Sequence, residues 1–320
     1  MPSFFESLKS KAFRSHPSSY ERPSEAPPEW APAPETSHQW GLRNEASSDD
    51  YRSAEEFCAS HPVEPPRLLP SDVVDHINNV GCRAWAIEQP RTPRFKGKVR
   101  NQGDTKGRAA VVHVQTRPEC QDTCLLSTLP LLAGLYDIHG KQGVYYEVEI
   151  VQMDVDAGGF VAVGTACRPY PDWRLPGWNR QSAGLHLDDM RKFFEDPDGG
   201  RDYLTDSFES ISVRAGDTIG CGYEFSTGSL FFTYNGLRLP NAFKGVYLPR
   251  AAQDVYAAVG VSGGVEIKIN FGGDVFRWKE GNEWAWRVEG HVGRLGGGRA
   301  GEGDELPTYS EASSSTAVRR

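Results

Sequence analysis

His186 and its neighbours are the residues of this chain whose types could support catalysis. Asp188 and Asp189 follow the histidine and Ser182 precedes it, which supplies acid–base groups and a hydroxyl nucleophile. Such groups are usually accompanied by a recognisable motif, such as a nucleophile elbow or a phosphate-binding loop. The sequence contains neither, so we interpret His186 as a structural residue at the end of a strand. We expect no catalytic residue, no enzymatic activity and no cofactor.

Cys120 and Cys124 have the spacing of half a metal site. A structural zinc site needs four ligands, whereas the sequence offers no second cysteine pair and His113 alone is too few. We therefore expect no metal centre. The six cysteines are scattered and the first residues lack the apolar core of a signal peptide, which predicts a reduced, cytoplasmic protein.

Residues 168–180, RPYPDWRLPGWNR, form a long segment rich in aromatic residues and arginine. Aromatic and arginine side chains dominate the few residues that carry most of the energy of protein–protein binding. We therefore predict that this loop binds a partner protein. The structural alternative is that its tryptophans fold back over the edge of the domain. The predicted partner-binding residues, one of them from the following loop, are Tyr170, Trp173, Arg174, Trp178, Arg180 and Tyr203.

Residues 289–320 are rich in Gly, Ser and charged residues, which predicts a disordered, flexible tail. Within it, Leu306-Pro307-Thr308-Tyr309 matches the Leu/Pro-Pro-x-Tyr motif that WW domains bind. A polyproline-type turn would place Leu306 and Pro307 on an aromatic groove and Tyr309 in a second pocket. We predict that these three residues bind a WW domain. The alternative is a linker without a partner.

Strands dominate the residues between the two ends of the chain. The stretch 216–239 predicts three strands, with Asn235-Gly236 as a type I′ turn, because both central residues of that turn need positive φ. Gly220 and Gly222 alternate with apolar residues, so a backbone or an aromatic ring can approach one face closely. Further strands are predicted at 84–87, 99, 109–115, 125–132, 143–151, 160–165, 182–186, 211–213, 255–261 and 265–271. This spacing, with Gly-rich turns, indicates an all-β fold, an antiparallel β-sandwich.

Residues 1–65 are rich in Pro, Ser and Glu, which predicts a mostly disordered region with short helices. Residues 3–14 have two interpretations, an amphipathic helix that contacts a membrane peripherally or a frayed terminus. Trp30 and Trp40 are unusual in such a composition and could hold the region against the folded domain.

Two short helices are predicted before the strands. Ser47 or Ser48 is expected to cap a helix that runs to about Ser60. Ser71 is expected to cap a second helix, which Gly81 ends.

The net charge of the 320 residues is −8, which argues against a general nucleic-acid binder, because such proteins usually carry a basic domain. The sequence has no run of about 18 apolar residues, so no transmembrane helix is predicted.

Several motifs between residues 143 and 276 together resemble a SPRY (B30.2-like) domain. In chain order they are VYYEVEI at 144–150, VGT at 163–165, LPGW at 175–178, SAGLH at 182–186, GDTIGCG at 216–222, FFTYNG at 231–236 and INFG at 269–272. The resemblance implies a sandwich over residues 66–288, with its core at 143–276. It also implies a partner site made by loops at one end of the sandwich.

The chain resembles in particular the fungal SPRY adaptors of Nedd4-type ubiquitin ligases. This resemblance implies a SPRY domain that binds a client protein and a tail that recruits a WW-domain ubiquitin ligase, for endosomal or vacuolar trafficking. It also implies a location in the cytoplasm or on the periphery of endosomal or vacuolar membranes. The sequence departs from the family at Asp188-Asp189-Met190, where Asp-Asp-Gly is common, and has no membrane-anchoring helix. The alternative is a SPRY scaffold subunit of a Ran-binding-protein-like or chromatin complex, without ligase recruitment.

Overall fold

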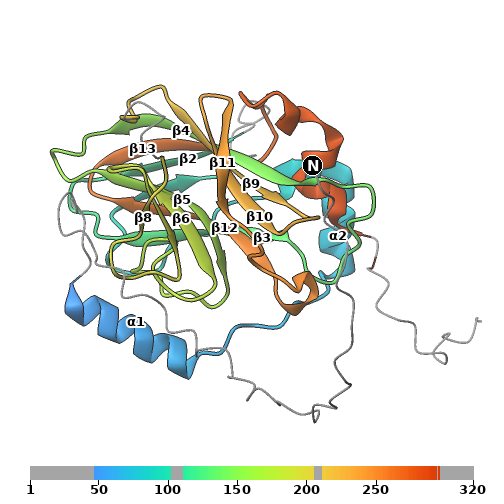
Figure 1. Cartoon of the computed structure of the whole chain (residues 1–320), viewed down its shortest axis with the longest axis horizontal. Helices are drawn as coiled ribbons and strands as arrows, with labels where there is room; N and C mark the ends of the chain where they lie inside the picture. The colour runs from blue at the N-terminus through green and yellow to red at the C-terminus, as the bar shows by residue number, and fades with distance from the viewer. Residues whose placement is uncertain (1–46, 102–110, 205–210, 294, 296–320) are drawn as a thin grey trace, which may run out of the picture. The chain divides into compact units, whose positions relative to one another are not determined.

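The computed structural model describes residues 47–101, 111–204, 211–293 and residue 295, which all belong to one compact unit. Figure 1 shows these residues as layers of strands with helices at their margins. The stretch at 3–14, Trp30, Trp40 and the motif at 306–309 lie outside the described residues.

The strands of the described residues form two antiparallel sheets. The seven-stranded sheet contains, in spatial order, β1 (Gly97–Arg100), β2 (Val112–Thr116), β13 (Val265–Asn270), β4 (Gly143–Met153), β9 (Thr218–Glu224), β10 (Ser229–Tyr234) and β11 (Leu237–Phe243). The six-stranded sheet contains β3 (Thr123–Leu132), β12 (Val255–Ser262), β5 (Phe160–Cys167), β6 (Ser182–His186), β7 (Arg191–Phe194) and β8 (Arg201–Asp202). The predicted antiparallel β-sandwich is confirmed.

The main hydrophobic core lies between the two sheets, because side chains alternate across the faces of each strand. On β4, Tyr146, Val148 and Ile150 belong to this core, as the alternation in the sequence predicts. Val163 of β5 and Val259 of β12 join the same cluster from the opposite sheet. Removal of this apolar surface from water is the main force that holds the sheets together.

The three predicted strands of 216–239 form the meander β9–β10–β11. The turn between the last two has φ of 49° at Asn235 and 83° at Gly236, which fits the predicted type I′ turn. The Asn235 side chain accepts a hydrogen bond from the backbone N–H of Thr218 (2.9 Å) and donates one to Asp217 Oδ1 (2.8 Å). These hydrogen bonds tie the turn to the beginning of β9.

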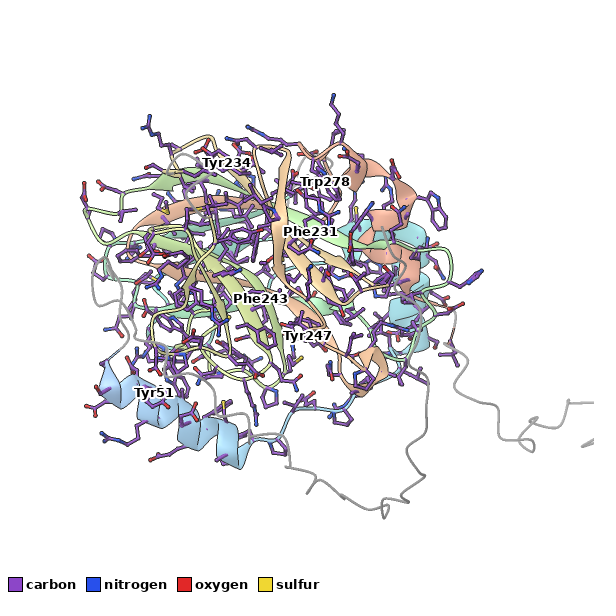
Figure 2. All side chains as sticks on the ribbon, viewed as in Figure 1. Tyr51, Phe231, Tyr234, Phe243, Tyr247 and Trp278 are labelled. Atoms are coloured by element: carbon purple, nitrogen blue, oxygen red, sulfur yellow. The ribbon has the colours of Figure 1, made fainter. Side chains whose placement is uncertain are left out.

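Gly220 and Gly222 leave room for aromatic rings on the outer face of the seven-stranded sheet. A Cβ atom on Gly220 would lie 1.9 Å from the hydroxyl oxygen of Tyr145, and one on Gly222 would lie 2.2 Å from Cζ of Phe231. The predicted close approach is confirmed. Phe231 and Trp278, both labelled in Figure 2, have ring centroids 5.3 Å apart. The buried cluster to which they belong contains Tyr145, Phe231, Phe276, Trp278 and Trp286.

Short 3-10 turns that follow β13 cover this aromatic cluster. They are η3 (Glu280–Asn282), η4 (Trp284–Trp286) and η5 (Val288–His291). The buried carboxylate of Glu147, on β4, holds the segment that leads into them. Its two oxygens accept hydrogen bonds from the backbone N–H groups of Arg277 and Trp278, each at 3.0 Å.

The remaining helical elements are α1 (Ser48–Ser60), α2 (Ser71–Val80), η1 (Gly81–Ala84) and η2 (Arg250–Ala252). Ser47 is the N-cap of α1, because its hydroxyl accepts a hydrogen bond from the backbone N–H of Asp50 at 3.1 Å. The predicted cap at Ser71 is wrong. That serine is already the first helical residue, and Pro70 occupies the cap position without a side-chain hydrogen bond. Gly81 ends α2 with φ of 65°, as predicted.

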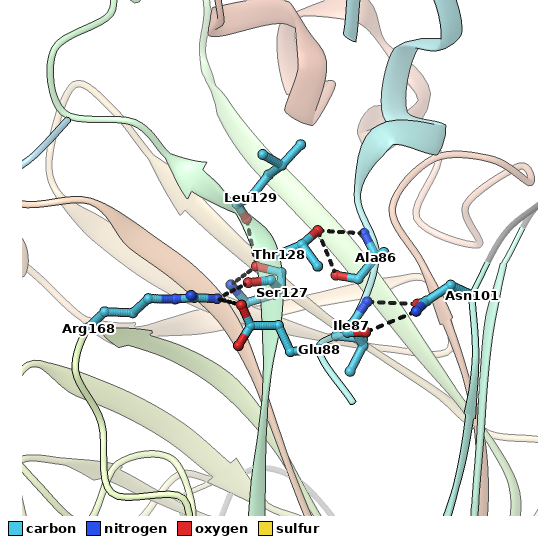
Figure 3. A network of polar contacts seen from close by, with 9 residues as sticks. Ala86, Ile87, Glu88, Asn101, Ser127, Thr128, Leu129 and Arg168 are labelled. Carbon is cyan, nitrogen blue, oxygen red and sulfur yellow. Dashed lines mark hydrogen bonds and ion pairs between the residues drawn. The ribbon is translucent and has the colours of Figure 1, made fainter. Parts of the chain in front are cut away.

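Two of the predicted strands, 84–87 and 211–213, are not strands in the structure. Ile87 makes only an isolated bridge to Ser127, because the side chain of Asn101 takes up its backbone groups (Figure 3). Oδ1 of Asn101 accepts from the Ile87 N–H at 2.8 Å, and Nδ2 donates to the Ile87 carbonyl at 3.0 Å. Residues 211–213 have no strand partner in the part of the chain that the structure describes. Conversely, β7 and β8 were not predicted, since strands this short show little alternation.

Candidate partner-binding site

The aromatic–arginine loop of residues 168–180 connects β5 to β6 and lies on the outer face of the six-stranded sheet. Glycines on that face make room for it. A Cβ atom on Gly184 would lie 2.1 Å from the carbonyl oxygen of Pro176, and one on Gly260 would lie 2.7 Å from Leu175 Cδ2. The loop therefore packs directly on the backbone of the sheet.

Trp178 and Tyr170 are buried between this loop and the sheet. Trp178 is 4 % exposed and packs with Leu175 and Phe193. The hydroxyl of Tyr170 donates a hydrogen bond to the Leu175 carbonyl at 2.7 Å, and burial raises the pKa of this phenol. Both residues therefore support the loop from beneath, which corresponds to the structural alternative for Trp178.

Arg174 is 1 % exposed, which is exceptional for a charged side chain. Its guanidinium carbon lies 4.5 Å from the ring centroid of Trp178, and its Nε donates to Asn179 Oδ1 at 2.8 Å. One terminal nitrogen, Nη1, has no hydrogen-bond partner within the described residues. Burial lowers the pKa of Arg174, since the charged form has lost its hydration.

Trp173 lies on the other side of the loop, against α1. Its indole Nε1 donates to the backbone carbonyl of Asp50 at 3.3 Å, and its ring meets Phe57 edge to face, with centroids 5.6 Å apart. The carboxylate of Asp50 also accepts two hydrogen bonds from Arg94, at 2.5 and 3.2 Å. This bidentate pair holds the first turn of α1.

Arg180 holds the last turn of the same helix. Its guanidinium donates to the carbonyl of Cys58 at 2.5 Å and to the carbonyl of His61. Next to it, the Asn179 side chain donates to Glu55 Oε1 at 3.0 Å. Trp173, Asn179 and Arg180 thus form, with Arg94, a surface that α1 covers, and we call it the helix-docking surface.

A groove of about 530 Å³ opens beside this loop, along β3. It is lined by Glu88, Gln89, Pro90, Arg91, Cys124, Leu126, Tyr170 and Asp172. Arg168 borders the same region, where its Nη2 lies 2.8 Å from Glu88 Oε1 and 2.6 Å from the Ser127 carbonyl oxygen (Figure 3). Sequence analysis missed this groove, because the residues that line it come from three separate stretches.

Tyr203 does not join the other predicted residues. It lies in the core between the sheets, where its ring meets Phe232 edge to face with centroids 5.7 Å apart. Its hydroxyl donates to the Pro240 carbonyl and accepts from the N–H of Phe232. Of the six predicted residues, Trp173 and Arg180 lie on the helix-docking surface, and Tyr170, Arg174 and Trp178 lie beneath it. Their role in binding a partner stays a prediction.

His186 ends β6 and is buried in the structure. Its Nε2 lies 3.0 Å from the Pro176 carbonyl, and its ring stacks on Phe193 with centroids 4.0 Å apart. Burial lowers the pKa of His186 to about 4. The hydroxyl of Ser182 donates to the Asn179 carbonyl at 2.5 Å. These contacts give both groups structural roles.

Cys120 and Cys124 are both buried, and burial raises the pKa of each thiol. Within the described ranges, no group of three or more His, Cys, Asp or Glu residues is arranged to hold a metal ion. None of the helices that the structure describes has the length and apolar character needed to cross a membrane.

Known proteins resemble this chain as follows. A model of the SPRY domain matches residues 143–274. "Protein ssh4" of Sclerotinia sclerotiorum is 28 % identical over 285 residues, which cover 86 % of this chain and 47 % of that protein. A SPRY domain-containing protein of Schizosaccharomyces pombe is 31 % identical over 175 residues, which cover 55 % of this chain and 40 % of that protein. The chain therefore spans less than half the length of these two relatives.

Among solved structures, a crystal structure of a human SPRY domain is 25 % identical, with a TM-score of 0.38. The match covers 54 % of this chain and 94 % of that one.

Proposed function

Residues 143–274 of this chain form a SPRY domain, and from that premise we propose that the chain is a non-enzymatic adaptor in protein interactions. In this proposal the SPRY domain binds a client protein, and the tail motif at 306–309 recruits a WW-domain ubiquitin ligase. The ligase then modifies the client and directs it to endosomal or vacuolar trafficking. The observation that carries the proposal is the presence of a SPRY domain and a Leu-Pro-x-Tyr motif in one chain.

The distribution of chemical groups in the sandwich supports a binding role. Its candidate catalytic groups, His186 and Ser182, are buried and hydrogen-bonded to backbone carbonyls. The indole of Trp173 and the guanidinium of Arg180, in contrast, lie at the outer side of a loop and contact α1 and the residue that follows it. Aromatic and arginine side chains in such positions are typical anchors of protein interfaces.

An adaptor of this kind works by tethering. Each of its two sites can be weak, because a chain that holds client and ligase together raises the effective concentration of one at the other. The gain reaches about 10² or more when both sites are engaged at once.

Binding of an isolated WW domain to the full-length chain tests the ligase-recruiting half of this proposal. Tyr309→Ala should weaken binding by about 30-fold, since a residue that fills its own pocket contributes about 2 kcal/mol or more. Tyr20→Ala is the matched control, because Tyr20 ends Pro17-Ser18-Ser19-Tyr20, a Pro-x-x-Tyr sequence that lacks the Pro two residues before the tyrosine, and should have little effect. Equal binding by wild type and Tyr309→Ala would favour the scaffold-subunit alternative.

A further inference from the structure

The helix α1 packs on the sandwich through few of its side chains. Ala54 and Cys58 are its buried residues, and Phe57, on the same side, is half-buried. Most of its other side chains are exposed. A helix of 13 residues that buries so little apolar surface gains little from the hydrophobic effect and is not stable alone in water.

Arginines of the sandwich contact both ends of α1. Arg94 pairs with Asp50 in the first turn, and Arg180 donates to the carbonyls of Cys58 and His61 at the other end. The last turn of α1 has no basic residue of its own. Arg180 therefore supplies, from the loop, the positive charge that the carbonyl end of a helix dipole favours.

Arg174 gives the helix-docking surface a further preference for negative charge. It is buried, and its Nη1 has no hydrogen-bond partner within the described residues. Burial lowers the pKa of Arg174, and nearby carboxylates act in the opposite direction, first that of Asp122 and then those of Asp50 and Glu55 on α1. A buried cation is costly unless opposite charge lies near it, so an acidic helix suits this position.

The chain that follows α1 is anchored to the sandwich independently of the helix. The backbone N–H of Glu64 donates to the Arg168 carbonyl at 2.8 Å, and that of Arg67 donates to Asp254 Oδ2 at 3.1 Å. The helix α1 can therefore detach from the helix-docking surface while these two hydrogen bonds to the sandwich stay intact.

We propose that the helix-docking surface formed by Arg94, Trp173, Asn179 and Arg180 binds a short acidic amphipathic helix of the client, and that α1 occupies it as an internal ligand. The contacts of α1 define the features of such a helix. It carries a carboxylate in its first turn, a small residue four positions later and an aromatic residue three positions after that, as at Asp50, Ala54 and Phe57. The client displaces α1, so capture is coupled to release of this helix.

The experiment uses the full-length chain and a fluorescent peptide of residues 47–61, followed by anisotropy. In wild type the site is occupied internally, and the peptide binds weakly. Ala54→Lys places a cation and extra volume at a fully buried position of α1, so it should expel α1 and free the site. If α1 is docked about nine-tenths of the time, the apparent affinity of the peptide rises about tenfold.

Ala59→Lys is the matched control, because Ala59 is an exposed alanine of the same helix. It should bind the peptide as weakly as wild type does. Arg180→Ala, added to Ala54→Lys, should abolish the gain. Equal binding by wild type and Ala54→Lys, with unchanged circular dichroism, would overturn the proposal.

Hydrogen exchange of the wild-type chain tests the proposal without any substitution. The amides of α1 should exchange at least about 100-fold faster than those of β5 and β12, because a displaceable helix opens locally. Protection equal to that of these strands would show that α1 is a fixed part of the sandwich and would refute the proposal. The inference rests on the proposed client-binding role of the loop, but neither assay contains client or ligase. If Tyr309→Ala did not weaken binding of the WW domain, the anisotropy and hydrogen-exchange results would still decide whether α1 is displaceable.

Discussion

Replacing Trp178 with alanine should destabilise the sandwich, whereas the same substitution at Trp173 should mainly release α1. Trp178 is 4 % exposed, packs against Leu175 and Phe193 and stacks beneath the guanidinium of Arg174. Truncation of a buried tryptophan leaves a cavity and lowers the free energy of unfolding by about 3–5 kcal/mol. For a domain of this size that corresponds to a loss of about 6–20 °C in Tm.

Trp173 contacts the peripheral helix α1 in two ways. These contacts are one hydrogen bond to the Asp50 carbonyl and one edge-to-face contact with Phe57. A single hydrogen bond contributes about 1 kcal/mol and an aromatic pair about 1 kcal/mol, and both stabilise the docking of α1 more than the sheets. Trp173→Ala should therefore lower the free energy of unfolding by less than about 2 kcal/mol.

Urea unfolding followed by far-ultraviolet circular dichroism measures both effects with the same probe. Each variant loses one tryptophan, so the pair is matched, and Trp178→Phe should recover part of the lost stability. If the free energies of unfolding of the two alanine variants agree within about 1 kcal/mol, Trp178 is not a buried packing residue, and its role in stabilising the sandwich is wrong. The outcome also decides which residue can test client capture, since only a variant that keeps its fold reports on binding.

Two further predictions concern the buried histidine and the glycine face. Burial lowers the pKa of His186 to about 4 from 6.5. The buried neutral His186 should thus contribute its full stabilisation above pH 6.5. The free energy of unfolding should fall as the pH drops from 6.5 toward 4, by up to about 1.4 kcal/mol per pH unit. Urea titrations at several pH values should show that His186→Gln flattens this pH dependence and that His139→Gln, at an exposed histidine, does not. Equal slopes of the free energy of unfolding against pH for the two variants would contradict the prediction. Gly222→Ala places Cβ 2.2 Å from the Phe231 ring and should cost about 1–3 kcal/mol, whereas Gly264→Ala, with ordinary contacts at 3.5 Å, should cost less in the same assay.

Strands and turns that depend on near neighbours were predictable from the sequence. Alternation in β4 and the positive φ at Asn235-Gly236 both follow from residues a few positions apart. The failures occur where a distant group satisfies the backbone. Ile87 shows this, because the side chain of Asn101 occupies its N–H and carbonyl in place of a neighbouring strand.

The candidate site was predictable in composition but not in arrangement. The content of Trp and Arg in residues 168–180 identified the loop, and the expected cap at Ser47 or Ser48 identified the helix. Nothing in either stretch indicates that the two meet. Asp50 and Glu55 were therefore missed as contacts of the loop, and so was Arg94.

The sequence by itself determined the class of fold, the meander of 216–239 and the residues from which a binding surface could be built. These depend on side-chain periodicity and on backbone dihedrals, which are local properties. Only the tertiary structure decided which side of the loop faces outward. Trp178 lies inside because the glycines of β6 and β12 let the loop pack on the sheet. Trp173 lies outside, under a helix whose contact with it spans 123 residues of sequence. Burial is a property of the whole packed chain, so residues of the same type in one loop acquire different roles.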